Sequence, residues 1–128
     1  MKINPAIPFI AMLFVFCPVV TQAQIPSLKE VFQSDFPVGV AINQRQFTGV
    51  DTNGVNLITS QFNAISPENV LKWEVVQPRP GANGFNFGPG DAYVAFGEKY
   101  NMLIVGHTLV WHSQTPRWVF RDENGRTH

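Results

Sequence analysis

The sequence predicts an α/β fold, with a parallel sheet or barrel rather than a sandwich. Three short apolar runs have the character of strands, and a helical segment lies between each pair of them. The resulting order is strand, helix, strand, helix, strand. Alternation of this kind implies parallel strands that are joined by right-handed crossovers.

The first strand and the first helix lie in the segment 36–62. Residues 36–42 form an apolar run that contains Pro37 and ends before the polar Asn43, which suits a strand buried on both faces. Further on, Val55, Ile58 and Phe62 recur at i, i+3 and i+7 within 51–62. This spacing places three apolar side chains on one face of a helix.

The remaining elements follow in the segment 64–106. Residues 64–66 read as a brief strand, because Pro67 favours extended backbone in the residue before it. The stretch 77–90 carries seven prolines and glycines, so we expect no regular structure until Asp91 caps a helix over 91–100. Residues 102–106 read as a third strand, which continues into 107–112.

The N-terminal residues 1–23 have the pattern of an export signal. Lys2 supplies the positive start, residues 7–20 are nearly all apolar, and small residues precede a cleavage position at Ala23. A membrane anchor is the alternative, but this apolar run is shorter than the ~20 residues of a spanning helix. We therefore expect a secreted or periplasmic protein, with 24–128 as its mature part. Cys17 is the sole cysteine, so the mature part forms no disulfide.

The charge balance argues against polyanionic partners. The chain has nine basic and nine acidic residues, and loss of Lys2 with the signal leaves eight basic residues without a long run of either sign. Nucleic acid is therefore excluded as an expected partner, as is a membrane after signal cleavage. We infer no obligate protein partner.

Polar, charged and aromatic residues directly follow the three predicted strands, and the ends of the strands are where the functional groups of α/β barrels lie. They are Asn43 after the first strand, Glu68, Asn69 and Lys72 after the second, and His107, Trp111 and Gln114 after the third. Together these groups donate and accept hydrogen bonds as hydroxyl binding requires. The alternative for the second group is a helical turn in which Glu68 and Lys72 pair on a solvated face, worth ~0.3–0.5 kcal/mol.

The third group suits a carbohydrate cleft. In an extended segment, His107, Leu109 and Trp111 share one side, and an indole offers a flat apolar face to a sugar ring. The alternatives are that Trp111 and Trp118 fill a core and that His107 is an interior, hydrogen-bonded histidine. His107 and His112 lie on opposite sides of such a segment, so a metal site is not expected, and no strained serine turn or phosphate loop is present.

Two segments, 62–73 (FNAISPENVLKW) and 106–118 (GHTLVWHSQTPRW), closely resemble family-10 endo-xylanases, and the resemblance covers about 28–128. It implies a (β/α)8 barrel, of which this chain contains about three of the eight strands. It also implies an enzyme that hydrolyses internal β-1,4 bonds of xylan with retention of configuration and without a metal or an organic cofactor. By resemblance, Glu68, Asn69 and Lys72 bind sugars on the non-reducing side of the scissile bond. His107, Trp111 and Gln114 line the sugar at and beside that bond.

The resemblance also implies that the catalytic acid and the nucleophile are glutamates on later strands. The acid should follow an asparagine, and no Asn-Glu pair occurs in this sequence. We therefore expect both glutamates beyond His128, 24–128 to be a partial catalytic domain, and the fragment alone to be inactive. A non-catalytic extracellular xylan-binding protein is the alternative, and a plain structural domain is the third hypothesis.

Overall fold

The computed structural model describes residues 25–122 and 124–127, so the predicted export signal at 1–23 lies outside the described residues. The elements follow one another along the chain as α1 (Leu28–Val31), β1 (Gly39–Ile42), α2 (Gln44–Phe47), α3 (Thr52–Gln61), β2 (Ala64–Pro67), α4 (Trp73–Val76), the 3-10 helix η1 (Ala82–Gly84), α5 (Gly88–Lys99), β3 (Leu103–Ile104) and the 3-10 helix η2 (Arg117–Val119). None of the helices in this part of the chain has the length and apolarity of a membrane span.

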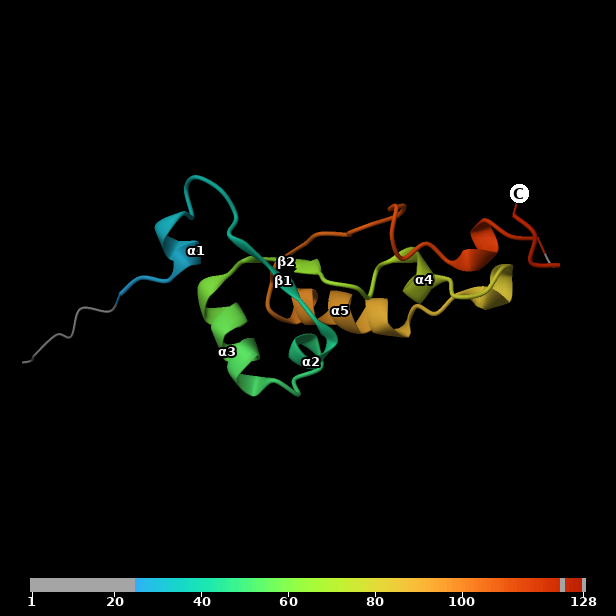
Figure 1. Ribbon diagram of the computed structural model, residues 1–128. Helices are drawn as coiled ribbons and strands as arrows, with labels where there is room; N and C mark the ends of the chain where they lie inside the picture. The colour runs from blue at the N-terminus through green and yellow to red at the C-terminus, as the bar shows by residue number, and fades with distance from the viewer. Residues whose placement is uncertain (1–24, 123, 128) are drawn as a thin grey trace, which may run out of the picture.

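The three strands form one parallel sheet in chain order, β1-β2-β3, which confirms the predicted alternation. The register pairs Val40 with Ile65, and Ile65 with Ile104. Helices α2, α3 and α5 lie together on one side of this sheet (Figure 1). Two strands are shorter than expected, because β1 begins only at Gly39 and β3 ends at Ile104.

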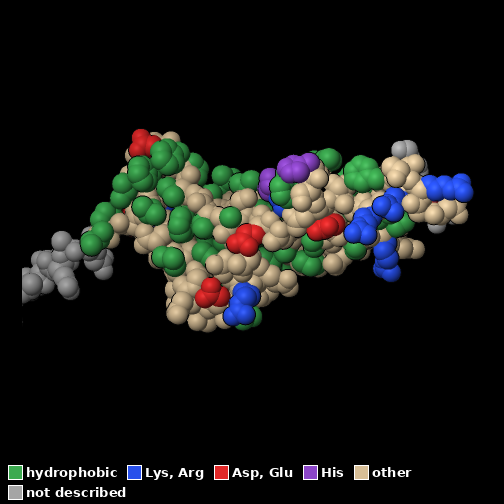
Figure 2. Space-filling view, in the orientation of Figure 1, with side chains coloured by type: hydrophobic (Ala, Val, Ile, Leu, Met, Phe, Trp, Pro, Cys, Tyr) green, Lys and Arg blue, Asp and Glu red, His purple; other side chains and the backbone are tan. Residues whose placement is uncertain are grey.

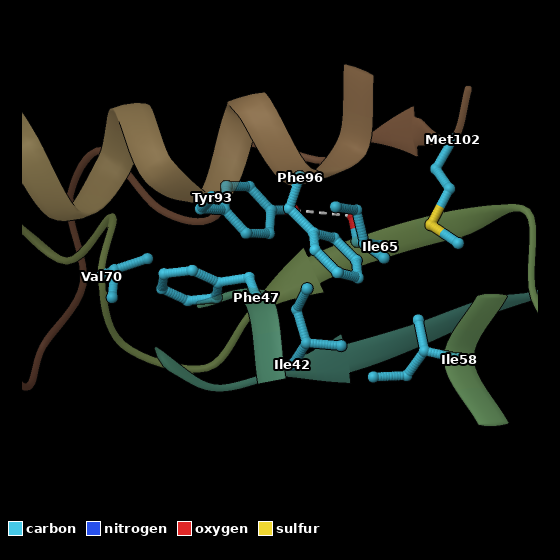
Figure 3. Close-up of a cluster of buried hydrophobic side chains, with 8 residues drawn as sticks. All are labelled: Ile42, Phe47, Ile58, Ile65, Val70, Tyr93, Phe96 and Met102. Atoms are coloured by element: carbon cyan, nitrogen blue, oxygen red, sulfur yellow. Dashed lines mark hydrogen bonds between the residues drawn. The ribbon is translucent and has the colours of Figure 1, made fainter. Parts of the chain in front are cut away.

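The hydrophobic core lies between the sheet and these helices. Its buried members are Ile42, Phe47, Ile58, Ile65, Val70, Tyr93, Phe96 and Met102. Figure 3 shows Ile42 and Ile65 of the strands pointing toward Tyr93 and Phe96 of α5. The Tyr93 hydroxyl donates to the carbonyl oxygens of Ile65, at 2.8 Å, and of Val105, at 3.0 Å. This phenol therefore joins α5 to both β2 and the end of β3.

The two longer helices confirm the predicted helical segments, with one correction. Asp51 caps α3 as its side chain accepts from the backbone N–H of Gly54 at 2.9 Å. The N-cap prediction for Asp91 is wrong, because α5 begins three residues earlier, at Gly88. Pro89 stands in the first turn, where its missing N–H costs no helical hydrogen bond, so a proline there starts the helix rather than preventing it.

Three helices of four residues each were not expected from the sequence: α1, α2 and α4. A single turn is too short to produce an amphipathic period, so only its caps could have indicated it. Asn43, which follows β1, has such a role. Its side chain accepts from the backbone N–H of Arg45 and caps α2.

Candidate functional site

The candidate site is built from two stretches that follow neighbouring strands. We call residues 68–73, after β2, the first segment, and residues 107–118, after β3, the second segment. The strands are parallel and adjacent, so their carboxyl ends lie at the same edge of the sheet. The first segment is joined to β1 as well, because the Glu68 N–H donates to the Ile42 carbonyl at 3.0 Å.

The first segment does not form the helical turn that was the alternative prediction. Helix α4 begins only at Trp73, and Lys72 is its N-cap residue. Glu68 and Asn69 are exposed, but the Lys72 residue is only 4% exposed and thus does not lie on a solvated face. A turn held by the Lys72 N–H on the Asn69 carbonyl, at 2.9 Å, directs the lysine inward.

The second segment does not continue β3 as an extended strand, so the predicted alternation of His107, Leu109 and Trp111 is wrong. Strand β3 ends at Ile104, and residues 109 and 110 lie in a bend. His107 is exposed and Trp111 is 38% exposed, so the described part of the fold buries neither side chain. Of the two tryptophans for which a core role was the alternative, Trp118 is half-buried and is consistent with that role.

Four of the six predicted site residues meet across the two segments. The Gln114 side-chain amide donates through Nε2 to Oδ1 of Asn69 at 3.1 Å. The Nζ atom of Lys72 lies 4.4 Å from the centroid of the Trp111 ring. The Glu74 backbone N–H, in α4, donates to the Gln114 carbonyl at 3.0 Å. The two segments therefore form one continuous polar and aromatic surface.

The other two predicted residues, Glu68 and His107, take no part in these contacts among the described residues. Glu68 and His107 are exposed, and within the described residues neither side chain hydrogen-bonds to the other four. His107 and His112 are the histidines that the structure describes, and Figure 2 shows the histidine side chains gathered at one place on the surface. The Trp111 ring also contacts His112 edge-on, with a centroid distance of 4.8 Å.

The chemical capacity of the surface is that of a hydroxyl-binding site with one flat apolar wall. Asn69 uses Oδ1 toward Gln114, which leaves its amide hydrogens to serve as donors to a ligand, and Gln114 keeps its Oε1 as an acceptor. Lys72 adds an ammonium with three donors. Within residues 25–122 and 124–127, no group of three or more His, Cys, Asp or Glu residues could hold a metal ion.

An apolar cavity of about 520 Å³ is lined in part by other residues of the two segments. Its lining includes Leu71, Phe85, Phe87 and Val94 with Leu109 and Val110, and none of the six predicted site residues. Such a lining offers few groups for hydroxyls. The cavity is therefore not the candidate sugar site.

Sequence reasoning missed the support behind the site. Trp73, Gln77 and Trp118 lie next to one another, with the two indoles in edge-to-face contact at 5.9 Å. The signal that could have indicated this was the position of each tryptophan, one residue after Lys72 and four after Gln114.

A family model described as "Glycosyl hydrolase family 10" matches residues 27–128. A beta-1,4-xylanase of Dictyoglomus thermophilum is 44% identical over 97 residues, which cover 76% of this chain and 26% of that protein. Endo-1,4-beta-xylanase A of Thermotoga maritima is also 44% identical, over 106 residues that cover 81% of this chain and 10% of the relative. The chain thus spans a minor part of the length of these relatives.

Solved structures give the same result for the fold. A GH10 endoxylanase from a sugarcane soil metagenome superposes with a TM-score of 0.71 at 40% identity, over 81% of this chain and 31% of that one. Xylanase B of Clostridium stercorarium F9 superposes with a TM-score of 0.71 at 36% identity, over 80% of this chain and 29% of the other. A mutant structure in complex with xylotriose superposes with a TM-score of 0.70 at 36% identity, over 81% of this chain and 30% of that one.

Proposed function

The chain belongs to glycosyl hydrolase family 10, and from this premise we propose that it supplies the sugar-binding half of an endo-1,4-β-xylanase active site. Its fold is the N-terminal part of a (β/α)8 barrel, with three parallel strands and their helices. The proposed substrate is xylan or a xylo-oligosaccharide, in keeping with the names of its relatives and with the xylotriose bound in one similar structure.

The observation that carries this proposal is the meeting of the two segments at one edge of the sheet. Two contacts, one between Asn69 and Gln114 and one between Lys72 and Trp111, join residues that the resemblance assigns to neighbouring sugars. The amides and the ammonium suit ring hydroxyls, and the 38% exposed indole suits the C–H face of a sugar. Glu68 and His107 are both exposed and would add contacts to the ligand.

The proposal assigns no catalytic acid and no nucleophile to the described residues. Retaining hydrolysis requires two carboxyl groups ~5–5.5 Å apart, one to protonate the leaving oxygen and one to attack the anomeric carbon. By the resemblance, both are glutamates of later barrel strands. The residues of this chain would bind and orient the sugars on the non-reducing side and at the scissile bond, and no metal or organic cofactor takes part in the proposed reaction.

The proposed location is outside the cytoplasm. It is supported by the pattern of 1–23, with its positive start, its apolar run and its small residues before the cleavage position. A polymer such as xylan is too large to enter a cell intact, so a xylan-binding surface is useful there. N-terminal sequencing of exported protein would test this, with a new N-terminus at Gln24 as the expected result.

Titration of the chain with xylotriose by calorimetry tests the binding surface. We expect saturable binding, and we expect Trp111→Ala to weaken it at least tenfold, because a buried tryptophan contact contributes about 2 kcal/mol or more at such sites. The matched control is Tyr100→Ala. Tyr100 is 36% exposed and also lies beneath a lysine ammonium, with Lys99 Nζ 5.2 Å from its ring, but at the C-terminal end of α5. Equal affinity for the chain and for Trp111→Ala would refute the proposed site.

A further inference from the structure

Two indoles meet behind the candidate site, and one glutamine contacts both. The Trp73 and Trp118 rings lie 5.9 Å apart at an interplanar angle of 88°. The Trp73 Nε1–H donates to Oε1 of Gln77 at 3.1 Å, and the Trp118 Nε1–H donates to the Gln77 backbone carbonyl at 3.2 Å. Both indole donors are therefore satisfied by a single residue that directly follows α4.

This cluster lies directly beside the residues proposed to bind sugar. Trp73 follows Lys72 in the chain, and Trp118 follows Gln114 by four residues, with the buried Pro116 between them. The Trp118 bond to Gln77 spans 41 residues of sequence and joins the second segment to the end of α4. No residue of the cluster is among the six assigned to the ligand.

Gln114 is the residue most dependent on this support. Its φ of 53° lies in the left-handed region, which a residue with a β-carbon seldom adopts unless its surroundings hold it there. Its carbonyl accepts from the Glu74 N–H, and its side chain donates to Asn69. The contact with Glu74 requires the second segment to lie against α4, and the contact with Asn69 requires it to lie against the first segment.

We propose that Trp118 is a positioning residue: without contacting the sugar, it holds the second segment against α4 and so places Gln114 and Trp111 against Asn69 and Lys72. The inference rests on the proposed function for its effect on sugar binding, but its first step concerns the protein alone. A tryptophan that merely fills space would contribute to global stability without a specific effect on the contact between Glu74 and Gln114.

Amide hydrogen exchange of the chain, followed by NMR, tests the first step without ligand. The Glu74 amide reports the docked second segment, because its hydrogen bond ends on Gln114. In Trp118→Phe, which keeps an aromatic ring but loses the donor to Gln77, we expect this amide to exchange at least tenfold faster. The Val105 amide, which donates to Ile65 within the sheet at 2.9 Å, should keep its rate and serves as the internal reference. An unchanged Glu74 rate overturns the proposal.

Xylotriose affinity tests the second step. We expect Trp118→Phe to raise the dissociation constant about fivefold, and we expect this effect to become smaller when Gln114→Ala is also present, because the two changes both act on the contact made by Gln114. The control is Phe120→Leu, in the exposed aromatic residue that directly follows η2, which should leave the affinity unchanged. Faster Glu74 exchange with unchanged affinity would refute the positioning role.

The two steps separate failure of the inference from failure of the proposed function. If the unsubstituted chain binds no xylotriose, the proposed function fails, while the Glu74 rate still decides whether Trp118 holds the second segment. If Trp118→Phe also accelerates exchange at Val105, the sheet has opened, and Trp118→Tyr takes its place. That variant keeps a larger aromatic ring and still lacks the indole N–H that donates to the Gln77 carbonyl. Faster exchange of the Glu74 amide, with an unchanged rate at Val105, would then support the proposal. An unchanged Glu74 rate would contradict it.

Discussion

Replacement of Lys72 by methionine separates binding from stability at the centre of the candidate site. Methionine keeps an unbranched chain of similar length and removes the ammonium group. The residue is 4% exposed, and its Nζ lies 4.4 Å from the centroid of the Trp111 ring. The substitution therefore tests the charge with little change in packing.

The expected loss of affinity follows from the hydrogen bonds that the ammonium would donate to sugar hydroxyls. Hydrogen bonds to charged groups contribute about 1.5–3 kcal/mol, which corresponds to a roughly 10- to 150-fold rise in the xylotriose dissociation constant. Stability should behave differently. The contact of an ammonium with an indole contributes only about 0.5–2 kcal/mol, and the unbranched methionine chain would still pack beside the ring. The free energy of unfolding should thus change by less than about 2 kcal/mol.

Calorimetric titration with xylotriose and urea unfolding of the same preparation measure both quantities. Lys99→Met is the matched control, because Lys99 also lies over an aromatic ring, that of Tyr100, away from the two segments. This control should leave the affinity unchanged. A dissociation constant within twofold of the original for Lys72→Met would show that the ammonium donates nothing to the sugar. A loss of stability above about 2 kcal/mol would instead assign Lys72 a structural role.

Three further predictions concern stability and activity. Burial raises the pKa of Tyr93 from its ordinary value of 10.0 to about 12, so the neutral phenol is favoured in the folded state. Its contribution is complete below pH 10 and is lost as the pH rises toward 12, and urea unfolding across this range should show a fall that Tyr93→Phe removes. Gly97→Ala should lower the free energy of unfolding by about 1–2 kcal/mol, because the new Cβ would lie 2.5 Å from Cγ1 of Ile104 and helix propensity offsets only part of the strain. Gly88→Ala is the control and should not lower the free energy of unfolding, because the nearest atom to its new Cβ would be Oδ1 of Asn86 at 3.8 Å. The chain alone should release no reducing sugar from xylan in an end-group assay, and measurable release would contradict the absence of acid and nucleophile from the described residues.

Much of the fold was accessible from the sequence because local signals and tertiary packing agree. The period of Val55 and Ile58 gave α3, and the apolar runs gave three strands in the observed order. The beginning of α5 was missed because a proline-rich run is typical of both a loop and a first helical turn. The packing of α5 on the sheet, including the close approach of Gly97 to Ile104, favours the helical turn over the loop at this position.

The six predicted site residues could be selected from the sequence, but the contacts among them could not. All six follow predicted parallel strands, and the topology of such a sheet brings the strand ends together. The bond between Asn69 and Gln114 spans 45 residues, and no local pattern contains it. Lys72 shows the limit most clearly, because an i, i+4 spacing to Glu68 suggests a solvated pair, whereas a turn at Asn69 directs the lysine inward.

The shared hydrogen bonds of Tyr93 have a consequence for engineering. Its hydroxyl holds the carbonyls of Ile65 and Val105, which precede Glu68 by three residues and His107 by two. One phenol on α5 therefore holds the two strands together immediately before the first and second segments begin. Substitutions that tilt or rotate α5 would change the distance between these segments, so the substrate preference of the proposed sugar site could be altered through the helix without replacing any of its six residues.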